Sequence, residues 1–327
     1  MLRLRQFLAL AGLAAVEAIR QPVVLLLTTS CVLATTLTPL MLMHNFGEEG
    51  KLARDGGLAY HMVFGLFVAA YAACSSLSRE MRSGTASAVL SKPVGREVFF
   101  LAKFAGIAAV VAMFSACATV ATLLSERVSE HFIFTPQEAG YVTDWQTGRL
   151  LLAAPFAAFF AAGILNYTAR RPFQSTAYLL LLAGLLAVFF VSGFFNRHGQ
   201  PAPLDFLVQW RIIPASLLIT LALFLLAAFA VALATRLSTV PTLTVCSAVF
   251  LLGMLSDFLF GHAGTHSPAG LLYAVIPDWQ HFWLSDALDN GGAIPWTYVA
   301  NATLYAGAYG GAVLLLGIVS FRHAEMK

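Results

Sequence analysis

The stretch ASLLITLALFLLAAFAVALAT, residues 215–235, contains no charged side chain. A helix needs about 20 mostly apolar residues to cross the apolar core of a bilayer, so this run predicts a membrane-spanning helix. The whole chain has the same character: 59% of its 327 residues are hydrophobic and only 11% are charged. A soluble domain carries about 25% charged residues. The sequence therefore predicts an integral membrane protein, and nothing in it resembles a basic nucleic-acid groove.

Seven further runs are long and apolar enough to span a membrane. They lie at approximately 22–43, 58–78, 104–124, 149–167, 175–195, 240–260 and 299–320. We therefore expect an all-α integral membrane protein, a polytopic bundle of about eight transmembrane helices. Residues 22–327 form the transmembrane domain in this interpretation.

The N-terminal segment, residues 1–21, is too short and too interrupted by charges to be a span. Its apolar residues share one helical face: Phe7, Leu8, Ala11, Ala15 and Ile19. This pattern predicts an interfacial amphipathic helix lying on the membrane.

The distribution of basic residues predicts the orientation, because cytoplasmic loops are enriched in Lys and Arg. With eight spans and the N-terminus inside, 13 of the 19 basic residues fall on the inner side and six on the outer side. Most acidic residues fall outside. We therefore expect both termini in the cytoplasm, a cytoplasmic connection over 78–103, and a multi-pass protein of the cell membrane, in a bacterium the inner membrane.

The densest charge occurs in SREMRSGTASAVLSKPVGREVFF, residues 78–100. We interpret this stretch as helix, turn and helix: Pro93 breaks the first helix, and a second helix begins at Arg96 and runs through Lys103 into the third span. Such an element suits docking on a cytosolic protein. The simpler alternative is that inner loops are basic only because of orientation.

The residue order E-x3-GT, then L-S-K-P-V-x-R, then a lysine before the next span resembles the ABC type-2 permease family. The matching positions are Glu80, Gly84, Thr85, Leu90, Pro93, Val94, Arg96 and Lys103. In that family this segment is the coupling helix, so the resemblance implies that the matching positions up to Arg96, together with Arg82, contact an ATPase subunit. One departure is the number of spans: the family usually has six, and we expect one additional hairpin among spans four to seven.

The resemblance implies a non-catalytic transport subunit, an exporter by expectation. Its expected partners are two copies of a cytosolic ABC ATP-binding subunit, a second copy of the permease or a related permease, and membrane lipids, with no nucleic acid. ATP and magnesium would bind to the partner subunit, and no cofactor to this chain.

The residues themselves favour the same interpretation, because the sequence has no GxxxxGK[ST] phosphate loop and no ion relay within its spans. His61 and Asp257 are expected near outer ends. No catalytic residue and no metal site is predicted, and the four cysteines form no CxxC pair.

Two alternatives stay open. One is a non-transporting assembly or sensor subunit of an ABC complex. The other is an intramembrane lipid-modifying enzyme built on the polar residues of one outer region: Asp257, His262, His266, Asp278 and His281.

The outer segment 261–298 is rich in aromatic residues, among them Trp279, Phe282 and Trp283. Because tryptophan and tyrosine concentrate at the membrane–water boundary, we expect one or two short interfacial helices here. They would form an outer gate or a simple aromatic anchor. In the second span, Gly65, Ala69 and Ala73 recur every four residues, a spacing that suits close packing within one chain or between two copies.

Overall fold

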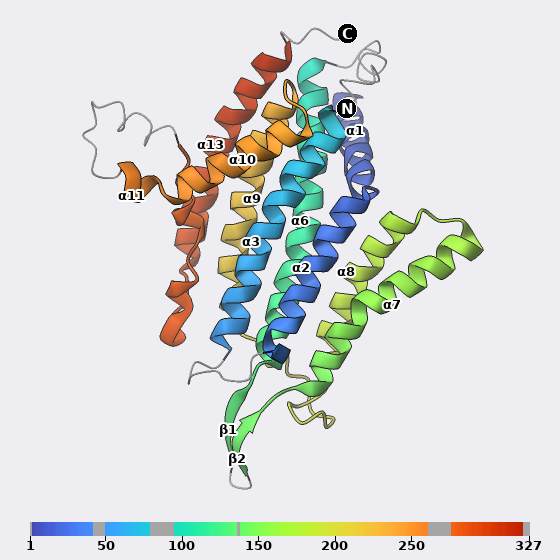
Figure 1. Cartoon of the computed structure of the whole chain (residues 1–327), viewed down its shortest axis with the longest axis vertical. Helices are drawn as coiled ribbons and strands as arrows, with labels where there is room; N and C mark the ends of the chain where they lie inside the picture. Colours follow the sequence, from blue (N-terminus) through green and yellow to red (C-terminus); the bar gives the residue numbers. More distant parts are fainter. Residues whose placement is uncertain (1, 42–49, 79–94, 136–137, 261–275, 323–327) are drawn as a thin grey trace.

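The computed structural model describes residues 2–41, 50–78, 95–135, 138–260 and 276–322. Figure 1 shows a bundle of long helices with a small two-stranded sheet at one end. Helix α1 (Leu2–Ile19) begins, and α13 (Trp296–Arg322) ends, at the opposite end. We call this end the inner end and the end with the sheet the outer end.

Within the described residues, seven helices are long and apolar enough to cross a membrane. Besides α13 they are α2 (Pro22–Met41), α3 (Lys51–Ala73), α6 (Arg96–Val128), α7 (Trp145–Ala169), α8 (Phe173–Ser192) and α9 (Ile212–Ala234). Each covers one of the expected spans. The prediction of an all-α polytopic membrane protein is confirmed.

The expectation of one continuous helix over 240–260 is wrong. Helix α10 (Thr239–Met254) has 16 residues, about 24 Å at 1.5 Å per residue, which is shorter than the apolar core of a bilayer. It is followed by α11 (Ser256–Phe260) and, after residue 275, by the 3₁₀ turns η2 (Gln280–Phe282) and η3 (Asp286–Gly291). The seventh of the eight expected crossings is thus interrupted.

Helix α1 packs along the inner part of α6. A Cβ on Gly106 would lie 2.4 Å from the Ala11 carbonyl oxygen and 2.7 Å from Ala14 Cβ, so the two helices need glycine for this approach. The helix itself was expected, but its buried face is centred on Ala14 and Ala18, and Leu8 is exposed. Its contact with the membrane surface stays a prediction.

The centre of the bundle is formed by α3, α6 and α9. A Cβ on Gly65 would lie 2.3 Å from Leu223 Cδ1 and 3.0 Å from Phe114 Cε1, and Ala69 and Ala73 are fully buried. The small-residue spacing of the second span therefore serves packing within one chain, because this face is covered by α6 and α9.

Helices α7 and α8 form a hairpin that stands to one side of the bundle (Figure 1). They pack mainly on each other and supply most of a second, smaller hydrophobic cluster, while Ala162, Ala177 and Tyr178 belong to the main one. Large apolar side chains such as Phe160 and Tyr167 are exposed on the hairpin. At its outer end α6 leads into it through the antiparallel strands β1 (His131–Thr135) and β2 (Glu138–Val142), where Phe132 pairs with Tyr141.

Candidate functional site

The predicted coupling element is described only from Gly95 onward. Seven of its predicted contact residues therefore lie outside the described residues: Glu80, Arg82, Gly84, Thr85, Leu90, Pro93 and Val94. Arg96 is the first residue of α6, with Gly95 as its N-cap. The prediction that a helix begins at Arg96 and runs through Lys103 into the third span is confirmed.

On the other side of the undescribed segment, α3 ends in a π-helical turn, η1 (Cys74–Ser78). Such turns are rare, and they occur frequently at functional sites. The chain therefore leaves the second span through an irregular turn immediately before residue 79.

A polar cluster, the inner cluster of Glu17, Ser76 and Lys103, joins three elements at this end, with Ser76 and Lys103 buried and Glu17 partly exposed. The Lys103 side chain is 2% exposed, and its Nζ donates to Glu17 Oε2 at 3.3 Å and to Ser76 Oγ at 3.1 Å. The ammonium also lies 5.8 Å from the centre of the Phe99 ring. Because a buried charge needs a partner, these contacts fix α1, η1 and α6 relative to one another.

The inner ends of α6 and α13 are in direct contact. Arg96 Nη1 donates to the Arg322 carbonyl oxygen at 2.8 Å, and the Arg322 guanidinium pairs with the Glu97 carboxylate. From the turn that follows α9, Arg236 Nη2 donates to the Ser320 carbonyl oxygen at 3.0 Å. Exposed ion pairs contribute about 0–1 kcal/mol, so these contacts orient the helix ends more than they stabilise the fold.

Two aromatic residues of the outer segment, Trp279 and Phe282, are buried inside the protein. Trp279 is 1% exposed, its Nε1 donates to the Val249 carbonyl oxygen at 3.2 Å, and its ring packs on Phe250 and Phe282. Phe282 is fully buried and Trp283 is half-buried. The expected anchoring of Trp279 and Phe282 at the lipid boundary is therefore wrong, and a role in gating stays a prediction.

Glycine at position 253 explains this burial. A Cβ on Gly253 would lie 2.1 Å from Trp279 Cδ1 and 2.3 Å from the Pro277 carbonyl oxygen. The indole ring thus packs directly against the backbone of α10. The local pattern of aromatic residues gave no sign of this contact, because it depends on a residue 26 positions earlier.

A polar group lies beside Trp279 on α13. The Asp278 backbone N–H donates to Tyr305 Oη at 3.2 Å, and His281 Nδ1 lies 2.6 Å from Asp278 Oδ2 while its ring stacks on Tyr305. Tyr305 lies nine residues inside α13, about 14 Å from its outer end at 1.5 Å per residue. Irregular backbone at such a depth is tolerated where protein covers it, and the buried Trp279 and Phe282 provide that cover.

Of the residues considered for an enzyme, the structure brings together Asp278 and His281. His262 and His266 lie outside the described residues. Within the described part of the chain, no group of three or more His, Cys, Asp or Glu side chains could hold a metal ion. The Asp278–His281 pair thus has Tyr305 as its neighbour, a residue that sequence reasoning did not connect with it.

His61 lies deeper than the sequence suggested, because α3 begins at Lys51 and not near residue 58. The imidazole is fully buried and meets the edge of Phe114 at 5.7 Å between ring centres. Neither ring nitrogen has a hydrogen-bond partner among the described residues.

At the outer end, η3 is attached to the start of α3. Arg54 donates from Nη1 to the Leu288 carbonyl oxygen at 3.0 Å and from Nη2 to Asp289 Oδ1 at 2.6 Å, and Lys51 Nζ lies 3.0 Å from Asp289 Oδ2. Hydrogen bonds from Lys51 and from Arg54 lower the pKa of the Asp289 carboxyl below its ordinary value.

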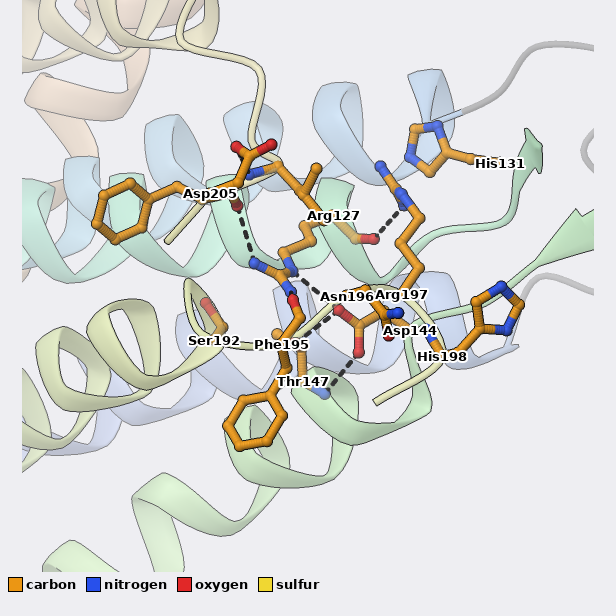
Figure 2. Close-up of polar contacts among 12 residues, drawn as sticks. Arg127, His131, Asp144, Thr147, Ser192, Phe195, Asn196, Arg197, His198 and Asp205 are labelled. Atoms are coloured by element: carbon orange, nitrogen blue, oxygen red, sulfur yellow. Dashed lines mark hydrogen bonds and ion pairs between the residues drawn. The ribbon is translucent and has the colours of Figure 1, made fainter. Parts of the chain in front are cut away.

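A second outer cluster, the outer network of Arg127, Asp144, Thr147 and Arg197, is drawn in Figure 2. Arg127 is fully buried at the end of α6, and its Nε donates to Asp144 Oδ2 at 2.8 Å. Asp144 is the N-cap of α7 and accepts hydrogen bonds from Thr147 N at 2.9 Å and Thr147 Oγ1 at 2.7 Å. One buried ion pair thus joins the end of α6 to the start of α7.

The same arginine holds the connection between α8 and α9. Its Nη2 donates to the Phe195 carbonyl oxygen at 2.8 Å, and its Nη1 donates to the Phe206 carbonyl oxygen at 2.9 Å. Arg197 Nη1 donates in return to the Arg127 carbonyl oxygen at 2.8 Å. Sequence reasoning missed this network, because it used these charges only as markers of orientation. The spacing of Asp144 and Thr147 before an apolar run is a helix-cap signal that could have located half of it.

Taken together, the fold and the polar contacts at both ends define a multi-pass helical membrane protein. No protein-family model matches the chain, and no curated protein matches it.

Proposed function

We propose that this chain is the membrane-spanning subunit of an ATP-driven exporter of the ABC type-2 permease kind, energised by a separate cytosolic ATP-binding subunit. The observation that carries the proposal is the geometry at the inner end. The inner cluster fixes η1, which precedes residues 79–94, to α6, which follows them, and to α1.

This geometry suits a docking element. A force applied to residues 79–94 reaches two spans directly, α3 through η1 and α6 through Arg96. It reaches a third through the contacts of Arg96 and Glu97 with Arg322 of α13. A loop that only connects two spans does not need contacts such as those of the inner cluster, because it does not have to hold its two ends in a fixed orientation.

The position of the α7–α8 hairpin supports the resemblance to a six-span family. The hairpin begins after α6 and ends before α9, at the outer end, and it lies at the side of the bundle. Without it, six crossings remain: α2, α3, α6, α9, the interrupted crossing that begins with α10, and α13. The outer network joins the two places where the hairpin leaves and re-enters the bundle.

The absence of a phosphate-loop motif from the sequence fits a subunit that receives its energy from a partner. Among the described residues of the spans, the imidazole of His61 is fully buried and neither ring nitrogen has a hydrogen-bond partner, while the buried Glu126 carboxylate lies at the outer end of α6 beside His131. A proton- or sodium-coupled carrier usually needs a relay of ionisable residues within its spans.

The test is co-purification followed by reconstitution. The tagged full chain is purified from its host in mild detergent, the retained proteins are identified, and ATP hydrolysis is measured in proteoliposomes. We expect an ATP-binding subunit to be retained. The double variant Glu80→Arg with Arg96→Glu should weaken that retention about tenfold to hundredfold, because a hydrogen bond to a charged group contributes about 1.5–3 kcal/mol.

Arg211→Glu is the matched control, since it reverses one charge at the outer end, where Arg211 Nε donates to Gln209 Oε1. It should retain the partner fully. Retention of the partner by the double variant at the wild-type level contradicts the proposed contact. Stimulation of ATP hydrolysis by a transported compound distinguishes a transporter from an assembly or sensor subunit.

A further inference from the structure

The outer end carries a polar pocket beside the outer network. Its volume is about 420 Å³. Its lining comes from the end of β2, the first turns of α7 and the connection after α8: Tyr141, Val142, Thr143, Trp145, Gln146, Arg149, Arg197 and His198. Two of these side chains are arginines, and none of the lining residues that the structure describes is acidic.

The pocket is held in shape by buried contacts. Arg127 fixes the carbonyl oxygen of Phe195, two residues before Arg197, and its ion pair with Asp144 fixes the start of α7. The Asn196 side chain then closes a tight turn by accepting from the backbone N–H groups of His198 at 3.1 Å and Gln200 at 2.9 Å. Arg197 and His198 are thus presented by a rigid turn.

Glycine at position 199 is needed for this turn. Its φ of +76° lies in the left-handed region, and a Cβ there would lie 2.4 Å from Gln146 Oε1. The turn therefore packs directly against the first turn of α7, and this contact brings His198 to the same pocket as Arg149.

The charged side chains that line the pocket, Arg149 and Arg197, are both basic. The charges of Arg127 and Asp144 neutralise each other at 2.8 Å. Arg149 lies on the second turn of α7, is exposed, and makes no hydrogen bond or ion pair with another described residue. Arg197 Nη1 donates to the Arg127 carbonyl oxygen, which fixes this guanidinium at the pocket. Guanidinium groups present a planar fork that matches the oxygens of a phosphate group.

We propose that this pocket binds a phosphate group, with Arg149 and Arg197 as its principal ligands and His198 as a further donor. Helix α7 begins at Trp145, so the pocket lies at the outer end of a membrane-spanning helix. Trp145 and Tyr141 are exposed at its rim, as aromatic residues at the level of lipid headgroups are. The phosphate belongs to the headgroup of an outer-leaflet lipid or to a soluble phosphate compound, two sources with the same chemistry.

The experiment measures lipid and phosphate binding to the full chain in dodecyl maltoside. Native mass spectrometry compares phosphatidylglycerol with a diacylglycerol of the same acyl chains, and calorimetry measures inorganic phosphate. The variants are Arg149→Gln, Arg149→Lys and, as a control elsewhere at the outer end, Arg211→Gln. Because Arg149 is exposed, its replacement should leave the fold intact.

We expect phosphatidylglycerol to bind about tenfold more tightly than diacylglycerol, and Arg149→Gln to remove this preference, a change that corresponds to about 1.4 kcal/mol. Arg149→Lys should restore part of it, and Arg211→Gln should bind as the wild type does. If inorganic phosphate binds and Arg149→Gln abolishes that binding, the source is a soluble phosphate. Equal binding of the two lipids together with no binding of inorganic phosphate overturns the proposal, and so does wild-type binding of both ligands by Arg149→Gln.

Discussion

Replacement of Arg127 by methionine should lower the free energy of unfolding more than replacement of an exposed residue does. The wild-type guanidinium is fully buried and donates to Asp144 and to the carbonyl oxygens of Phe195 and Phe206. The variant leaves the Asp144 carboxylate buried without its counter-charge, and it leaves two carbonyl oxygens without this donor. Removal of one partner of a buried ion pair costs about 3–5 kcal/mol. We expect a loss of that size in the free energy of unfolding.

The assay is unfolding of the purified full chain in mixed micelles with increasing sodium dodecyl sulfate, followed by circular dichroism. Arg149→Gln is the matched control, because this exposed arginine has no described partner and should change stability by less than about 0.5 kcal/mol. Adding Asp144→Asn to Arg127→Met should recover part of the loss, since the uncompensated charge is then absent while an acceptor for Thr147 remains. The reasoning is refuted if Arg127→Met unfolds within about 1 kcal/mol of the control.

Three further predictions concern the interior, the outer end and the inner end of the protein. Gly253→Ala should cost about 1–3 kcal/mol in the same titration, because the added Cβ would lie 2.1 Å from Trp279 Cδ1; an unchanged midpoint would contradict this packing. Asp289→Asn should lower the stability at pH 7, and the difference from the wild type should begin to shrink as the pH falls below about 4 and disappear below the lowered pKa of the folded state. The reason is that a carboxyl with a lowered pKa contributes stability above its unfolded pKa and loses it as the pH falls through the folded pKa; a difference that grew in acid would refute the assignment. Lys103→Met should accelerate amide hydrogen exchange over 74–78 at least about tenfold, since it removes the charged donor to Glu17 and Ser76; unchanged exchange would exclude a holding role for the inner cluster.

The spans could be predicted because each depends on local composition. The run 215–235, for example, is apolar enough to be a helix in lipid whatever surrounds it, and α9 covers it from Ile212 to Ala234. The start of α6 at Arg96 was also predictable, since Pro93 and Gly95 precede it and interrupt any earlier helix. The interruption of the seventh crossing could not be predicted, because the composition of residues 240–260 is the same whether or not the helix continues.

The polar contacts could not be predicted for a related reason. Lys103 and Glu17 are separated by 86 residues, and Arg127 reaches carbonyl oxygens 68 and 79 residues away. Nothing in the local sequence specifies a partner at such a distance. Local signals located the ends of elements, such as the cap at Asp144, and the packing of the bundle determined which ends meet.

The π-helical turn at Cys74–Ser78 has a consequence for how the chain can vary. In a π-turn each N–H bonds one residue further back than in an α-helix, so the turn accommodates one extra residue. Successive residues of an α-helix differ in direction by about 100°, and loss of one residue here would therefore turn Ser76 away from Lys103 while the rest of α3 keeps its neighbours. A single insertion or deletion within these five residues would change the contacts of Cys74, Ser76 and Leu77 and leave the packing of α3 before Cys74 in place, so the direction in which the chain leaves α3 can change in steps while most of the membrane-spanning part is kept.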